Sequence, residues 1–152
     1  MILMTRVDCR LLHGQTAVSW TSGLGADCIL IANDAVITDE LRKTTMKLAK
    51  PAGTKLVIKN MEDSITALKS GVTDKYRLFI VVESIEDAAK LALAVPEVDK
   101  VNLGLVKAKE AQEIKLPAGY RKVLLNNYKE IAEDGQTIRL QGYQVLVLEM
   151  GI

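Results

Sequence analysis

The ten residues Arg6-Val7-Asp8-Cys9-Arg10-Leu11-Leu12-His13-Gly14-Gln15 follow the first apolar run of the chain and contain its only histidine. Two arginines, Arg6 and Arg10, precede that histidine, and residues 15–21 after it have the pattern of a helix. The stretch therefore predicts a cationic turn between a strand and a helix. Phosphate chemistry suits such a turn, because arginine side chains and a helix N-terminus both attract anions.

The same strand-then-helix pattern continues along the chain. Seven short runs rich in Val, Ile and Leu begin about 22 to 27 residues apart, at 2–7, 28–32, 55–58, 78–83, 100–105, 122–125 and 144–148. That spacing leaves room for a helix between successive strands, as in a parallel α/β sheet. Near-continuous apolar runs are typical of strands buried on both faces.

Capping signals place helices between these runs. Helices are predicted at 39–48, ended by Pro51 and Gly53, at 60–70 after Asn60, and at 85–95 after Ser84. Asn127 with Glu130 predicts a last helix in the same way.

Two segments are ambiguous. Residues 106–116 fit either a ragged helix or a long loop. Residues 131–141 contain Asp134-Gly135, a hairpin-type turn signal, but Ile131, Gly135 and Ile138 lie at helical spacing, and we favour a helix.

Composition limits the class of protein. A chain of 152 residues with 49% hydrophobic and 26% charged residues fits one globular domain, residues 1–152. A net charge of +1 argues against a nucleic-acid partner. The sequence shows no apolar run long enough to span a bilayer, no signal peptide, and only two cysteines, Cys9 and Cys28, so we expect a cytoplasmic protein with free thiols.

The turn itself has the residues of a phosphoryl acceptor. Ligands of open parallel sheets bind beyond the carboxyl ends of the strands, where residues 8–13 are expected to lie. Arg6, Arg10 and the helix end should lower the pKa of His13, keeping the ring neutral and nucleophilic at pH 7. Asp8 can orient a ring nitrogen or hold an arginine. The pattern calls for no cofactor and no metal.

An ordinary structure fits the same residues. A single histidine before a helix is commonly a capping or surface residue, and arginines in a turn are commonly solvated. Trp20 is expected to pack in the core, with a partner-facing position as the alternative, and Cys28 is expected to be core. Asp34, Arg42 and Lys43 are expected to line the rim of the site at the end of the second strand, with a solvated helix face as the alternative for Arg42 and Lys43.

The motif Arg6-Val7-Asp8-x-Arg10-Leu11-Leu12-His13-Gly14-Gln15 with Trp20 resembles the active-site signature of the mannose–fructose–sorbose IIB components of the bacterial phosphoenolpyruvate-dependent sugar phosphotransferase system. Asn33-Asp34, residues 39–44 and Val101-Asn102-Leu103-Gly104 are similar to that family too. The resemblance implies a single open, mostly parallel seven-stranded sheet with helices on both faces and an antiparallel last strand.

The resemblance also implies a relay. His13 would accept a phosphoryl group from a IIA phosphocarrier and pass it to a sugar bound by the membrane components IIC and IID. Arg10 would be the main phosphate ligand, with Arg6, Gly14 and Gln15 also in the phosphate site and Arg6 and Asp8 organising the loop. The protein would work in the cytoplasm, at the membrane, through the transporter subunits.

Two positions depart from the family pattern. Cys9 stands where the family often has an acidic residue, and Leu105-Val106 stand where it has glycine and methionine. Alternative functions are a regulatory phosphorylated domain without sugar transfer, and phosphocysteine chemistry at Cys9. A phosphoaspartate receiver lacks its acidic pair here, and a dinucleotide site lacks its glycine-rich turn.

Overall fold

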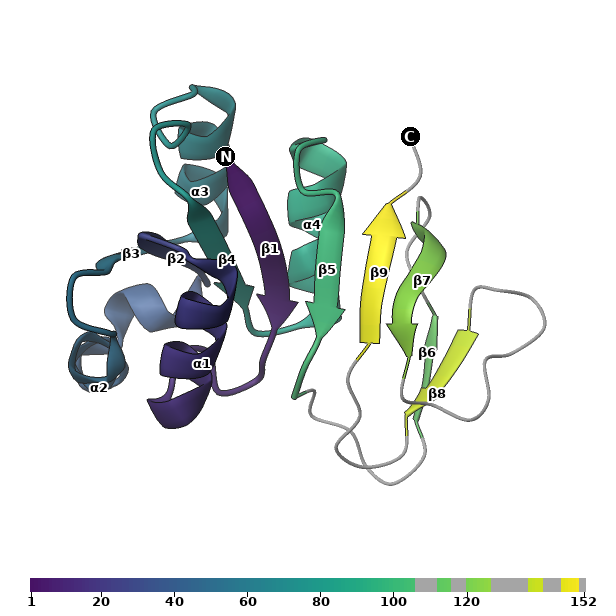
Figure 1. Cartoon of the computed structure of the whole chain (residues 1–152), viewed down its shortest axis with the longest axis horizontal. Helices are drawn as coiled ribbons and strands as arrows, with labels where there is room; N and C mark the ends of the chain where they lie inside the picture. Colours follow the sequence, from purple (N-terminus) through teal and green to yellow (C-terminus); the bar gives the residue numbers. More distant parts are fainter. Residues whose placement is uncertain (106–111, 116–119, 127–136, 141–145, 151–152) are drawn as a thin grey trace.

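Strands and helices alternate along the first 103 residues of the chain (Figure 1). The computed structural model describes residues 1–105, 112–115, 120–126, 137–140 and 146–150, with residues 15 and 16 and all of the described residues after 105 described as backbone only. The elements of the alternating part are β1 (Ile2–Val7), α1 (Gly14–Leu24), β2 (Cys28–Ala32), the short 3-10 helix η1 (Ala35–Thr38), α2 (Glu40–Ala49), β3 (Lys55–Lys59), α3 (Met61–Lys69), β4 (Leu78–Val82), α4 (Ile85–Ala94) and β5 (Lys100–Leu103).

Five strands form an all-parallel sheet in the order β3-β2-β4-β1-β5. The order places β1 in the interior of the sheet, between β4 and β5. In this register Val7 lies beside Val82 and Leu103, and Arg6 lies beside Asn102. The carboxyl ends of three strands therefore meet around the residues that follow Val7.

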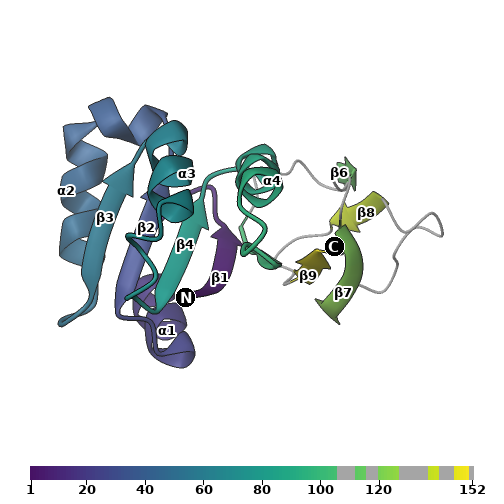
Figure 2. The same ribbon diagram turned by 90° about the horizontal axis from the view of Figure 1, so that it is seen from above.

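Helices cover both faces of these strands, as Figure 2 shows for α1 and α4. On one face, Ala17 of α1 and Met46 of α2 pack with Ile29, Ile31 and Phe79. On the other face, side chains of α3 and α4 pack with the alternate residues of the same strands, among them Leu30 and Ile80. The alternation follows from strand geometry, in which successive side chains point to opposite faces.

The helices α3 and α4 begin directly after the predicted capping residues, and α2 begins one residue later than predicted. The side chains of Asp39, Asn60 and Ser84 each accept a hydrogen bond from the backbone N–H three residues later, at the starts of α2, α3 and α4. Gly25 ends α1 in the left-handed conformation with φ 64°, which glycine adopts without a steric cost.

The rest of the described chain is β-structure. Its strands are β6 (Gln112–Lys115), β7 (Tyr120–Asn126), β8 (Thr137–Leu140) and β9 (Leu146–Met150). β9 pairs antiparallel with β5 and with β7, and β6 pairs with β8 in a separate two-stranded sheet.

This arrangement corrects the predicted fold class. The prediction of a single, mostly parallel seven-stranded sheet with one antiparallel last strand is wrong. The described residues form nine strands in two sheets. Five parallel strands make up the α/β part of the larger sheet, β9 and β7 extend that sheet beyond β5, and β6 and β8 form the other sheet. Antiparallel pairing occurs at three strand pairs.

Two missed strands explain much of the difference. Residues 112–115, within the predicted helix or loop, form β6, and residues 137–140, within the predicted helix 131–141, form β8. Thr137-Ile138-Arg139-Leu140 alternates polar and apolar residues with the period of a strand, which the helical spacing of Ile131, Gly135 and Ile138 obscured. The helix predicted from Asn127 and Glu130 lies outside the described residues. Within the described part of the chain, no helix has the length and apolar character needed to cross a membrane.

Candidate functional site

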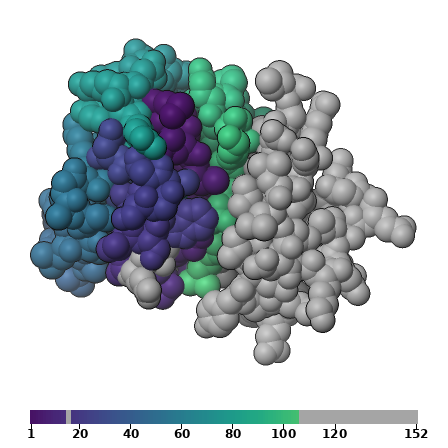
Figure 3. All heavy atoms as spheres, in the orientation of Figure 1, coloured from purple at the N-terminus to yellow at the C-terminus, as the bar shows by residue number. Residues whose placement is uncertain are grey.

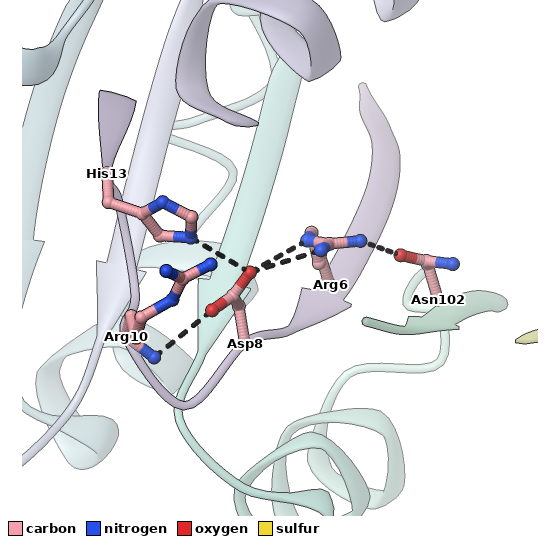
Figure 4. Close-up of polar contacts among 5 residues, drawn as sticks. All are labelled: Arg6, Asp8, Arg10, His13 and Asn102. Carbon is pink, nitrogen blue, oxygen red and sulfur yellow. Dashed lines mark hydrogen bonds and ion pairs between the residues drawn. The ribbon is translucent and has the colours of Figure 1, made fainter. Parts of the chain in front are cut away.

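The segment between β1 and α1 forms a tight turn at the carboxyl edge of the parallel sheet (Figure 4). The N–H of Asp8 donates to the carbonyl of Val82 at 2.9 Å, and the N–H of Cys9 donates to that of Leu105 at 2.6 Å. The N–H of Leu11 then donates back to the carbonyl of Asp8 at 2.8 Å and closes the turn. Neighbouring strands β4 and β5 thus anchor the start of the loop.

Leu11 holds the middle of this loop in an uncommon conformation. Its φ is +57°, the one positive φ of a non-glycine residue in the described chain. Its side chain is only 1% exposed and packs in the cluster between the sheet and α1. The left-handed conformation costs a non-glycine residue on the order of 1 kcal/mol, and burial of an entire leucine side chain offsets that cost.

His13 is the residue at which the loop becomes α1. Its backbone is extended, with φ −150° and ψ 142°, and its side chain makes no capping hydrogen bond. The ring is instead turned to Asp8, whose Oδ2 lies 3.3 Å from Nε2 (Figure 4). The His13 side chain is 24% exposed while that of Asp8 is 1% exposed, so one side of the ring is fixed and the ring still reaches solvent.

Arg6 is buried beside this pair. Its Nε and Nη2 lie 3.3 and 3.1 Å from the Oδ2 atom of Asp8, and its Nη1 donates to the side-chain oxygen of Asn102. The guanidinium carbon lies 4.9 Å from the centroid of the Trp20 ring, which is a cation–π contact. Burial lowers the pKa of Arg6, while the neighbouring Asp8 carboxylate acts in the opposite direction.

Arg10 has a different environment. Its backbone N–H donates to Asp8 Oδ1 at 3.1 Å, but its side chain is exposed, and among the described residues its guanidinium makes no hydrogen bond or ion pair. Gly14 is exposed, with φ +33°, and opens α1 together with the backbone of Gln15. The first N–H groups of a helix have no partner within it, so this end can bind an anion.

The other predicted residues take local roles. Trp20 is partly buried and stacks on Phe79 with ring centroids 6.2 Å apart, and Cys28 is 2% exposed in the core. Asp34 accepts a hydrogen bond from the N–H of Met61, at the start of α3. The Nη2 atom of Arg42 lies 3.4 Å from the Oε1 atom of Glu83, and the Lys43 ammonium group forms an ion pair with the Glu40 carboxylate.

Asn102 and Gly104 are members of the site whose contacts the sequence did not reveal. Asn102 is fully buried beside Arg6, and a Cβ atom at position 104 would overlap the Arg6 guanidinium. The sequence signal that could have indicated these contacts is a polar residue, Asn102, inside an apolar strand, with Gly104 two residues later. The described residues contain no group of three or more His, Cys, Asp or Glu side chains placed to hold a metal ion.

Comparisons with known proteins identify the family of this chain. The family model described as the sorbose subfamily IIB component of the phosphotransferase system matches residues 2–142. The chain belongs to that family. Its IIB relatives include a probable phosphotransferase enzyme IIB component of Streptococcus pyogenes serotype M6, 37% identical over 144 residues that make up 92% of this chain and 86% of the relative. A sorbose-specific IIB component of Lacticaseibacillus casei is 29% identical, over 74% of this chain and 68% of its own length.

Solved structures of IIB components have the same fold. The sorbose permease IIB domain of Klebsiella pneumoniae matches with a TM-score of 0.67 at 25% identity, covering 74% of this chain and 69% of that domain. An N-acetylgalactosamine IIB component of Streptococcus pyogenes matches with a TM-score of 0.62 at 30% identity, covering 72% of this chain and 67% of that one. As a IIB component, this protein is part of a sugar-uptake phosphotransferase system and works with its other components.

Proposed function

We propose that this IIB protein is a phosphohistidine relay in which His13 accepts a phosphoryl group from a IIA carrier and passes it to a sugar. The sugar would be bound by the IIC and IID membrane components, with the relay on the cytoplasmic side. The observation that carries the proposal is the contact between His13 and Asp8, because it leaves a partly exposed imidazole oriented at a cationic loop.

The contact also supports Nδ1 as the reacting nitrogen. An ionised carboxylate only accepts hydrogen bonds, so the atom facing Asp8 Oδ2 carries the proton, and that atom is Nε2. The lone pair is then on Nδ1, which attacks phosphorus of the donor phosphohistidine. The new P–N bond forms at Nδ1 as the donor P–N bond breaks, and the leaving electron pair returns to the donor imidazole. In the second transfer a sugar hydroxyl attacks the same phosphorus atom. The new P–O bond forms as the P–Nδ1 bond breaks, the electron pair of that bond returns to Nδ1, and the hydroxyl proton is released to water.

Arg10 is the residue best placed to bind the phosphoryl oxygens. Its guanidinium is exposed and unpaired within the described chain, and a planar fork binds two oxygens at once. The N–H groups at Gly14 and Gln15 would add helix-end stabilisation. Arg6 is buried against Asp8, Asn102 and Trp20, which supports its organising role more strongly than direct phosphate contact.

The test is phosphorylation of the protein by phosphoenolpyruvate, the general phosphotransferase enzymes and a cognate IIA, followed by mapping of the modified residue. We expect one acid-labile, base-stable phosphoryl group on His13, and none in His13→Ala. Cys9→Ser is the matched control and should still be labelled. An acid-stable label lost in Cys9→Ser would instead establish phosphocysteine chemistry.

A second measurement separates relay from regulation. Membranes containing IIC and IID should convert labelled IIB into sugar phosphate as the protein label disappears. Label that stays on His13 in the presence of those membranes and the sugar would identify a regulatory phosphoprotein instead.

A further inference from the structure

A groove lies on the face of edge strand β3 that is turned toward α3. The His13 loop follows β1, which is not a neighbour of β3 in the sheet. β2 and β4 separate β3 from β1. The groove holds a cavity of about 210 Å³. The side chain of Val57 and that of Ala67 on α3 form part of its apolar wall. The small side chain at position 67 leaves space that a larger residue would fill.

The charges around this groove are all positive. Lys55, Lys59 and Lys75 line it, and no acidic residue does. Within the described chain, none of these three ammonium groups has a carboxylate within salt-bridge distance. Alternate positions along β3 place Lys55, Val57 and Lys59 on one face of the strand, so the positive groups flank an apolar centre.

Tyr76 fixes one end of the groove. Its hydroxyl lies 2.8 Å from the Nζ atom of Lys55. The Nζ atoms of Lys55 and Lys75 lie 4.7 and 5.2 Å from the centroid of the Tyr76 ring. Both ammonium groups therefore lie near one aromatic ring, and an anion bound close to them would reduce their mutual repulsion.

We propose that this groove binds a small organic anion, with an apolar body about the size of one aromatic ring and a carboxylate or phosphate head. The cavity sets the size, since a dry cavity of about 150 Å³ accommodates benzene. The three lysines set the charge, and the apolar walls exclude a bare inorganic ion as the preferred ligand. The site is independent of phosphorylation at His13.

Sodium benzoate is the probe, titrated into the full-length, unphosphorylated protein while backbone amide resonances are followed. We expect saturable shifts at the amides of Ala67, Thr73 and Leu78. Benzyl alcohol, which has the ring without the charge, should bind about fivefold more weakly, which corresponds to the loss of one solvent-exposed ion pair. Equal binding of the two compounds would overturn the proposal.

Variants locate the site. Lys75→Gln and Lys59→Gln should each raise the dissociation constant for benzoate about fivefold, whereas Lys47→Gln on the exposed face of α2 should leave it unchanged. Ala67→Leu should abolish the shifts by filling the cavity without changing charge. Unsaturable shifts, or the same loss of affinity in Lys47→Gln as in Lys75→Gln, would show that no such site exists.

Discussion

Gly104 lies so close to Arg6 that a Cβ atom at position 104 would occupy the space of the guanidinium group. Trp20, from α1, contacts the same guanidinium, and Asn102 of β5 accepts one of its hydrogen bonds. Figure 3 shows α1, in dark blue-purple, on the face of the molecule that is turned to the viewer. A side chain at position 104 therefore has to displace a buried cation from its partners.

We predict that Gly104→Ala lowers the free energy of unfolding by about 1 to 3 kcal/mol, the usual cost of overpacking a buried site. It should also slow phosphorylation of His13, because Arg6 holds Asp8 and Asp8 orients the ring. Urea denaturation and the rate of phosphate uptake measure the two effects. Gly23→Ala is the matched control, since a Cβ there meets no atom within 4 Å and helix propensity should raise stability. Equal effects of both substitutions would contradict the close packing of Gly104.

Asp8→Asn should be among the most destabilising single changes in the chain. It leaves Arg6, which is 8% exposed, as a buried cation without its counter-ion. Losing one partner of a buried ion pair costs about 3 to 5 kcal/mol. The double variant Arg6→Met with Asp8→Asn removes that unpaired charge, so its free energy of unfolding should be higher than that of Asp8→Asn. Urea denaturation of Arg6→Met, Asp8→Asn and the double variant measures the coupling. If the losses of stability in the two single variants add up to the loss in the double variant, Arg6 and Asp8 are not coupled.

Arg10→Lys should act on rate and leave stability within about 0.5 kcal/mol, since its side chain is exposed and unpaired in the described chain. A lysine keeps the charge and loses the two-oxygen contact, so we expect transfer to slow by roughly tenfold to a hundredfold. Rapid-quench measurement of phosphoryl transfer from IIA tests this. Arg77→Lys, at the opposite edge of the sheet, should transfer at the rate of the unmodified protein.

The pH dependence of stability should include a contribution from Asp87. Partial burial raises its pKa above the ordinary 3.8, and a hydrogen bond with Ser84 opposes this shift. The folded state therefore keeps the proton to higher pH than the unfolded chain does. Below pH 3.8 both states are mostly protonated, so stability contributed by this group is lost as pH rises above that value. Denaturation at several pH values gives the free energy of unfolding of wild type and of Asp87→Asn. The value for wild type should fall relative to that of Asp87→Asn as the pH rises above 3.8. A flat difference would contradict the shift.

The sequence predicted the parallel part of the fold well because local signals determine it. β1 and β2 have the predicted bounds, and the caps at Asn60 and Ser84 begin the helices they were expected to begin. The strands β6 and β8 were missed because each is four residues long, too short for periodicity to distinguish a strand from a loop or helix.

Part of the candidate site could be predicted from the sequence and part could not. Asp8, Arg10 and His13 lie within six residues, so their proximity could be predicted from the turn. The surroundings of Arg6 could not, because Asn102 and Gly104 are almost a hundred residues away in the chain. Only the register of β1 against β5, which places Arg6 beside Asn102, brings them together.

The left-handed backbone of Leu11 has a consequence for the timing of catalysis. Its conformation is imposed when the core forms, since the side chain is buried between the sheet and α1. The entropy of ordering the loop is thus spent during folding, before any donor protein arrives. If the proposed relay operates, a phosphorylated carrier would meet a loop that already has its final conformation, and no further ordering of this loop would be needed for transfer.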